Sequence, residues 1–194
     1  MRAHDTLRGI QRTLREYYAL EDAPDVCDFV HFGDSRETLY VREANDALEL
    51  SLHLPAQDPG DARAPEPAGD DTHLQLIEGV SHFVYIAERA RMELPATQLE
   101  LELQAEVDKF VYLGLGMTAS PHERSTLRTR LYEEVRYLHP QGTELGDRYR
   151  MATAVAARFV ARLDERLDKA SVQRHLRRFY RAGQTEKLSI ALAA

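Results

Sequence analysis

The stretch from His73 to Gly116 constrains the fold most, because it has the pattern of two helices separated by a proline break. In the first part, apolar residues recur at helical spacing and form one face that must be buried. These residues are Leu76, Ile77, Val80, Phe83, Val84 and Ala87. Pro95 forbids continuation of that helix, and Thr97 followed by Glu100 has the pattern of a capping box. We therefore predict two packed helices at the centre of one domain.

The second of these helices carries two apolar lines on different faces. One line consists of Leu99, Leu103, Val107 and Phe110, and the other of Leu101, Ala105 and Tyr112. Such a helix is either sandwiched between neighbours or presents one line to a partner. Because exposed apolar surface is unfavourable in water, we predict a protein-binding surface at Leu101 and Tyr112, either between copies of this chain or with another protein. The alternative is that both residues face the chain's own sheet.

The residues before this pair predict one helix and a small sheet. Leu7, Ile10, Leu14 and Tyr17 lie at helical spacing between Asp5 and Leu20. Three strand-like runs follow, separated by turn-forming residues: Cys27 to Phe32, Glu37 to Glu43, and Ala47 to Leu54. We expect them to pair as an antiparallel meander, with the alternating leucines of the third run buried.

The residues after the pair predict further helices. Ser120, with Pro121 and Glu123, begins a helix expected to reach Leu138; Thr143 begins a long helix to about Asp168, and a third spans Ser171 to Ala182. The fold class is therefore α+β: an N-terminal helix and a three-stranded antiparallel meander packed against a C-terminal bundle of four to five helices. Residues 1–55 form the first part, 56–72 a mobile acidic loop rich in Pro and Gly, and 73–194 the bundle, all within one compact domain.

Composition narrows the class of protein. The chain has 194 residues, a formal charge of -7 and one cysteine, Cys27, so neither an intrachain disulfide nor a four-cysteine zinc site can form. No apolar run approaches the roughly 20 residues that span a bilayer. We expect an acidic cytoplasmic protein without a membrane partner. The acidic residues are concentrated before position 121, with 10 Lys+Arg against 23 Asp+Glu there and 15 against 9 after it.

Glu78 and His82 are the leading candidates for a chemical site. They stand four residues apart on the first central helix, where a carboxylate and an imidazole can share a metal ion. A further carboxylate could come from Glu100, Glu102, Glu106 or Asp108 on the next helix, and we take Glu106 as the third candidate ligand, although spacing does not show that these residues converge. Tyr85 and Arg89 continue the same stripe. The alternatives are a solvated row of ion pairs or a buried polar seam between helices. A metal-dependent enzyme would use this site, with a divalent metal as its only predicted cofactor.

Four arginines near the C-terminus offer a second surface. Arg174, Arg177, Arg178 and Arg181 lie within eight residues and could contact nucleic-acid phosphates, although the acidic first part of the chain could equally pair with them. The usual nucleophile and phosphate-loop motifs are absent, so we assign no catalytic residue. The first functional hypothesis is therefore a non-enzymatic interaction or regulatory protein that acts through its helical half, with metal-dependent catalysis and nucleic-acid binding as alternatives.

Overall fold

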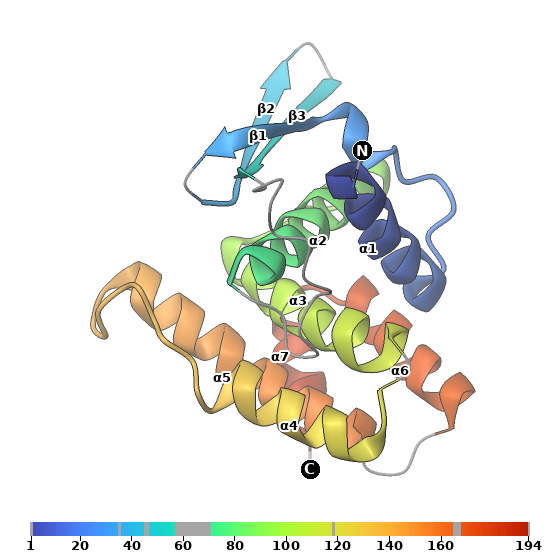
Figure 1. The fold of residues 1–194 in the computed structure, drawn as a ribbon, viewed down its shortest axis with the longest axis vertical. Helices are drawn as coiled ribbons and strands as arrows, with labels where there is room; N and C mark the ends of the chain where they lie inside the picture. The colour runs from blue at the N-terminus through green and yellow to red at the C-terminus, as the bar shows by residue number, and fades with distance from the viewer. Residues whose placement is uncertain are drawn as a thin grey trace.

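The computed structural model describes residues 2–34, 36–44, 47–56, 71–117, 119–164 and 168–193. It has an N-terminal helix, a three-stranded sheet and a C-terminal set of helices (Figure 1), which confirms the predicted α+β class. The elements are α1 (Arg2–Tyr18), β1 (Val30–Asp34), β2 (Thr38–Ala44), β3 (Ala47–Pro55), α2 (Asp71–Arg91), α3 (Gln98–Phe110), α4 (Pro121–Tyr132), α5 (Glu144–Asp164), α6 (Lys169–Arg181) and α7 (Gln184–Leu192). Most of the predicted acidic loop, residues 57–70, lies outside the described residues.

The sheet is mixed, which corrects the predicted antiparallel meander. Its strand order is β1-β3-β2, with β3 antiparallel to β2 but parallel to β1. β3 takes the centre because its alternating leucines supply the most apolar face, and Leu52 and Leu54 are completely buried. β1 is short and irregular: the predicted first strand begins as a 3-10 turn at Val26–Asp28, and the β1 register shifts between Phe32 and Asp34. A crossover therefore replaces the expected hairpin.

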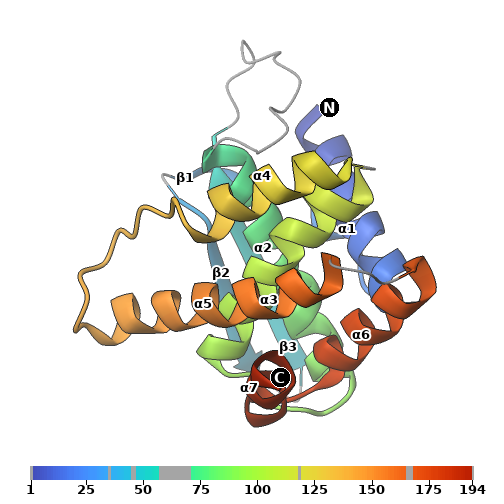
Figure 2. The same ribbon diagram turned by 90° about the horizontal axis from the view of Figure 1, so that it is seen from below.

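The two central helices occupy the middle of the molecule. α2 lies against the sheet, and α3 is sandwiched between α2 on one side and α4, α5 and α7 on the other (Figures 1 and 2). Thr97 and Glu100 form the predicted capping box at the start of α3. The apolar residues of both α3 lines are partly or completely buried. This confirms the sandwiched arrangement, because the chain's own elements cover most of that helix.

Gly79 lets α2 approach the sheet closely. A Cβ atom added at Gly79 would lie 2.8 Å from Leu54 Cδ2, 3.0 Å from Leu52 Cδ1 and 3.0 Å from Glu37 Cγ. These distances are too short for a real side chain, so the sheet or the carboxylate would have to move. The glycine thus fixes the position of Glu37 relative to α2.

Replacing Gly79 with alanine should destabilise the protein by about 1–3 kcal/mol through overpacking, in spite of the better helix propensity of alanine. Urea denaturation measures the change. Gly9→Ala is the matched control, because a Cβ at Gly9 in α1 meets no atom within 4 Å and should stabilise slightly. Equal stabilisation by both substitutions would contradict the close approach.

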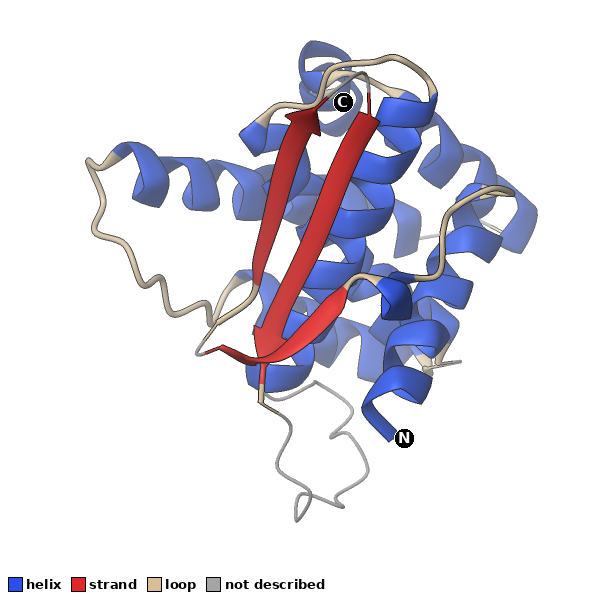
Figure 3. Ribbon diagram, turned by 90° about the horizontal axis from the view of Figure 1, so that it is seen from above, coloured by secondary structure: helices blue, strands red, loops and turns tan. Residues whose placement is uncertain are grey.

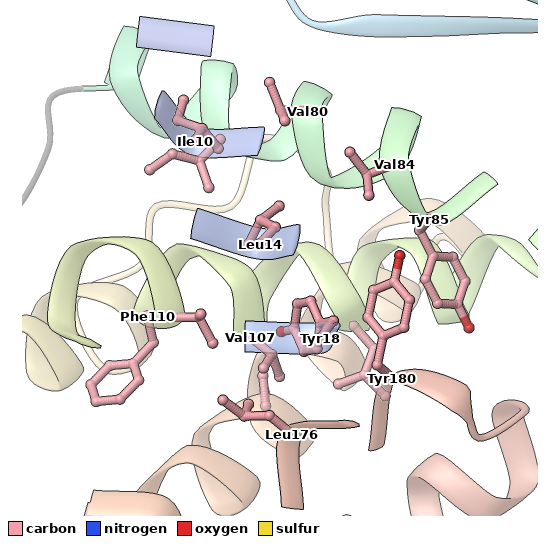
Figure 4. Packing of buried hydrophobic residues seen from close by; sticks show 14 of the residues in the cluster. Ile10, Leu14, Tyr18, Val80, Val84, Tyr85, Val107, Phe110, Leu176 and Tyr180 are labelled. Atoms are coloured by element: carbon pink, nitrogen blue, oxygen red, sulfur yellow. The ribbon is translucent and has the colours of Figure 1, made fainter. Parts of the chain in front are cut away.

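The apolar core joins α1 to the central helices and to α6. Figure 4 shows Ile10 of α1 near Val80 of α2, and Tyr18 of α1 beside Val107 of α3 and Tyr180 of α6. The buried aromatic residue in α1 is Tyr18, whereas the predicted Tyr17 is only partly buried. The prediction was therefore wrong by one residue. Tyr18, the last residue of α1, continues the buried line of Ile10 and Leu14.

Among the C-terminal helices, α6 lies close to its predicted bounds, α5 ends at Asp164 rather than at about Asp168, and α7 was not predicted as a helix. The largest difference is in α4. That helix ends at Tyr132, and Leu138, predicted to face inward, is 64% exposed. The segment after Tyr132 is held by side chains of α5, where Arg150 donates to the His139 carbonyl and lies over the Tyr137 ring. The described residues contain no helix long and apolar enough to cross a membrane.

Candidate metal centre

Glu37, Glu78 and His82 form the candidate metal centre. One ligand atom from each of the three lies within 4.8 Å of the others. Glu78 and His82 are one turn apart on α2, and Glu37 directly precedes β2, where Gly79 admits it to the helix surface. The side chains of His82 and Glu37 are about nine-tenths buried. The candidate metal centre therefore lies between the edge of the sheet and one turn of α2, where these side chains are largely shielded from bulk water.

The imidazole of His82 has carboxylates on both sides. Its Nδ1 lies 3.2 Å from Glu37 Oε1, whereas its Nε2 lies 3.9 Å from Glu102 Oε2, beyond hydrogen-bonding distance. Nε2 is buried and has no hydrogen-bond partner among the described residues. Burial alone would lower the pKa of His82, but the hydrogen bond to Glu37 and the charges of Glu37, Glu78 and Glu102 raise it to about 9.

Glu102 of α3 holds its proton more tightly than an ordinary carboxyl group. Burial and the nearby charge of Glu78 raise its pKa to about 7, although His82, Arg148 and Lys109 act in the opposite direction. His82 and Glu102 therefore both favour their protonated forms. A buried cluster of carboxylates retains protons in this way when no added cation neutralises it.

Glu106, the third predicted metal ligand, is not among the three converging ligand atoms. Its carboxylate lies 2.7 Å from Lys109 Nζ, and Lys109 Nζ also lies 2.8 Å from Glu78 Oε2. Although burial would lower the pKa of Lys109, the charges of Glu106 and Glu78 raise it. Lys109 is therefore a fixed internal cation between two carboxylates. Glu37 occupies the position that the sequence analysis gave to Glu106.

Two cavities reach this cluster from different sides. The first, with a volume of about 460 Å³, is lined at its floor by Glu37, His82 and Glu102. The second, of about 570 Å³, is lined by Glu78, Glu106 and Lys109 among others. The buried polar seam proposed as an alternative for the Glu78 stripe is therefore present, and the solvated row of ion pairs is not, because His82, Tyr85 and Arg89 are buried.

The predicted partner surface on α3 lies largely inside the chain. Leu101 is 9% exposed and lines the first cavity, and Tyr112 is partly buried with its ring beside that of His73. Neither residue belongs to a large exposed apolar patch. Binding of a partner at this line stays a prediction.

The C-terminal arginines do not converge on a single feature. Arg174, Arg178 and Arg181 are exposed on α6, while Arg177 is partly buried and donates to the Tyr17 carbonyl oxygen. Arg178 Nη2 lies 3.9 Å from a carboxylate oxygen of Glu186 on α7. Part of this face therefore stabilises the packing of α6, and its binding to nucleic acid stays a prediction.

A second buried polar group, Lys187 of α7, was not predicted from the sequence. Its Nζ donates to Gln104 Oε1 at 2.6 Å and to the Phe179 carbonyl oxygen at 2.9 Å, and lies 4.3 Å from the centre of the Phe179 ring. Burial lowers the pKa of Lys187 to about 7, although the charge of Asp108 acts in the opposite direction. This group fixes α7 to α3 and α6.

Asp108 continues the polar network from Lys187 toward α1 and α2. It accepts hydrogen bonds from Ser81 Oγ at 2.6 Å, from Gln104 Nε2 at 2.9 Å and from the Tyr18 hydroxyl. Burial raises the pKa of Asp108 to about 6, although these hydrogen bonds lower it. The Asp108 carboxylate is surrounded by hydrogen-bond donors and lines none of the cavities described above. The network around Asp108 therefore stabilises the packing of the helices, whereas the cluster around His82 lines a cavity.

Comparison of the chain with models of known families, with characterised proteins and with solved structures gave no match.

Proposed function

We propose that this protein binds a divalent metal ion through Glu37, Glu78 and His82, with Glu102 close enough to join the coordination. The observation that carries the proposal is the convergence of one ligand atom from each of these three residues within 4.8 Å. In addition, the buried Nε2 of His82, on the Glu102 side of the ring, has no hydrogen-bond partner among the described residues. An unsatisfied buried nitrogen costs free energy, and a metal ion is a partner that would satisfy it.

The charge of the cluster also favours a cation. Four carboxylates gather here: those of Glu37 and Glu102 face the His82 imidazole, and those of Glu78 and Glu106 pair with the Lys109 ammonium. The guanidinium groups of Arg148 and Arg36 also act on Glu102 and Glu78, which leaves three permanent positive charges against four carboxylates in the described part of the chain. Excess negative charge in a buried place must be neutralised by protons or by a cation. A divalent ion would replace the protons that His82 and Glu102 retain without it.

The ligand types restrict the metal. One imidazole with two or three carboxylates suits Zn²⁺, Mn²⁺ or Fe²⁺ better than the soft ions that prefer thiolates. Cys27 takes no part, because it lies beside α1 and its pKa is raised to about 11, mainly by burial. Coordination positions left open by the protein would face the first cavity, where a bound water molecule or substrate could be polarised. A metal-dependent enzyme is therefore the class of activity that this site supports.

Adding Zn²⁺, Mn²⁺ or Fe²⁺ to chelator-treated protein should raise its melting temperature, because an ion that binds only the folded chain at 100 times its Kd stabilises it by about 2.7 kcal/mol. Differential scanning fluorimetry measures the shift, and elemental analysis of protein purified without chelator measures the stoichiometry. His82→Ala and Glu78→Gln should each weaken metal binding by more than the roughly 10- to 100-fold typical of outer-sphere changes.

His122→Ala is the matched control for these variants, because His122 is an exposed histidine of α4 far from the cluster in sequence. It should bind metal like the unaltered protein. The proposal fails if no ion binds stoichiometrically and none of the three changes the melting temperature. It also fails if His122→Ala and His82→Ala lose binding equally.

A further inference from the structure

The two edge strands of the sheet differ in the regularity of their pairing with β3. β1 forms one edge, and its bulge between Phe32 and Asp34 together with Gly33 interrupts regular pairing. β2 forms the other edge and pairs with β3 without a register shift from Thr38 to Ala44. No strand among the described residues pairs with the outer side of β2. Natural proteins usually protect such an edge with a bulge, a proline or charged side chains. β2 has no bulge, proline or lysine, but it carries Arg42 and Glu43, and Arg42 is paired with Glu49 of β3.

The side chains along this edge are apolar and accessible. Tyr40 is 58% exposed and Val41 is 47% exposed, although both are residue types that favour paired strands. Tyr40 lies on the outer face of the sheet, where its ring contacts that of His53. Val41 lies on the opposite face, because successive side chains alternate, and lines the first cavity with Leu39. The cavity is therefore a groove that runs beneath the open edge.

The groove has apolar walls and an acidic character. Its far wall is formed by apolar residues of β3, α2, α3 and the segment between the two helices: Leu48, Ile86, Leu94, Pro95 and Leu101. The acidic residues of its lining are Glu37, Glu43 and Glu102, of which Glu43 is exposed and Glu37 is paired with His82, which also lines the groove. Arg89 also lines the groove, but its guanidinium donates to the Pro95 and Arg181 carbonyl oxygens. A ligand of this groove thus meets apolar surface between carboxylates.

We propose that β2 binds an extended peptide segment of another protein as a fourth strand, with alternate apolar side chains in the groove and basic residues at the ends of the segment. Backbone groups of the unpaired edge supply affinity in this mode of recognition, and the groove selects every second side chain. About seven residues match the length of β2. Glu37 and Glu102 also belong to the proposed metal site, so metal bound there would weaken the attraction of basic residues. Pairing with the strand edge itself does not depend on the metal.

A second copy of the chain fits this edge less well than a peptide. Pairing β2 of two copies would place both helical layers on the same side of one continuous sheet. Figures 2 and 3 show that α5 extends past the β2 edge on the helical side. The helices of a second copy would need that space, whereas a single strand requires only the width of one chain, about 4.8 Å from β2.

The test uses fluorescein-labelled Arg-Val-Thr-Val-Thr-Val-Arg amide and fluorescence anisotropy, with chelator and with added metal. We expect saturable binding in both conditions. Val41→Arg should weaken this binding at least 10-fold, because it places a cation in the groove that would repel the basic probe. Tyr40→Arg is the matched control: it adds the same charge to the same exposed strand on the face away from the groove, and it should leave affinity within about 3-fold.

Two analogues of the probe test the mode of binding. Each analogue carries methyl groups on three alternate backbone nitrogens. In one analogue these nitrogens lie on one edge of the extended peptide, and in the other analogue they lie on the opposite edge. Only the analogue methylated on the edge that faces β2 should lose binding, since only that edge donates to the strand.

The inference is overturned if the probe does not bind, if both analogues bind like the parent, or if Val41→Arg and Tyr40→Arg weaken binding equally. Light scattering that showed a dimer blocked by Val41→Arg would replace the peptide by a second copy. Loss of binding with chelator alone would mean that the metal, not the strand edge, holds the probe.

Discussion

Replacing Lys187 with alanine will destabilise the protein by about 3–5 kcal/mol, the range expected when one partner of a buried charged or polar group is removed. The side chain is completely buried and fills the space beside the Phe179 ring. Its removal would leave a cavity and would deprive Gln104 Oε1 and the Phe179 carbonyl oxygen of their donor. Urea denaturation followed by far-ultraviolet circular dichroism measures the loss.

Lys187→Met separates the volume from the hydrogen bonds. Methionine keeps most of the length and its contact with the aromatic rings but supplies no donor, so the expected loss is smaller, about 1–3 kcal/mol. Lys169→Ala, at an exposed position at the start of α6, should change stability by less than about 0.5 kcal/mol. A Lys187→Ala variant as stable as Lys169→Ala would show that α7 does not pack against α3 in this way.

The elements that local signals specify were predicted well. Thr97 and Glu100 form a capping box, Ser120 and Glu123 form another, and each marks the first turn of a helix in the structure. Periodicity also identified the buried leucines of β3. These features depend on residues close together in the sequence, where helix caps and alternation have direct physical meaning.

The pairing of strands and the composition of the site depend on tertiary contacts and were predicted less well. The 3-10 turn Val26–Asp28 that precedes β1 contacts α1 and α2, and β1 then pairs parallel to β3, an arrangement that no local pattern encodes. Glu37 joins His82 across 45 residues, and a lone glutamate before a strand has no periodic signal. No local pattern marks Gly79 or Lys187, because their roles depend on the packing of α2 against the sheet and of α7 against α3.

The metal-free protein should lose stability as the pH rises from about 5 to 7. The fold raises the pKa of Glu102 from its ordinary value of 4.5 to about 7, and that of Asp108 from 3.8 to about 6, in both cases mainly through burial. A group with a raised pKa stabilises the fold fully below its unfolded pKa and loses that contribution as the pH rises through the folded value. For Glu102 the difference corresponds to on the order of 3 kcal/mol. The fold raises the pKa of His82 from 6.5 to about 9, so the loss of stability continues above pH 7. The fold lowers the pKa of Lys187 from 10.5 to about 7, so this residue adds stability as the pH rises above 7 and acts in the opposite direction.

Metal should reverse this trend at the candidate centre. Binding requires that His82 and Glu102 release the protons they retain in the metal-free fold, so the melting-temperature gain from Zn²⁺ should be small at pH 5.5 and grow toward pH 8. Glu102→Gln removes one of these titrating groups. It should reduce the loss of stability between pH 5 and 7, and it should also make the melting-temperature gain from Zn²⁺ depend less on pH. Asp108→Asn should flatten only the first, because Asp108 lies in the Lys187 network and faces no cavity of the metal centre. If the Zn²⁺ effect were the same at pH 5.5 and 8, or if the two variants behaved alike, metal binding would not be coupled to the protons of this cluster.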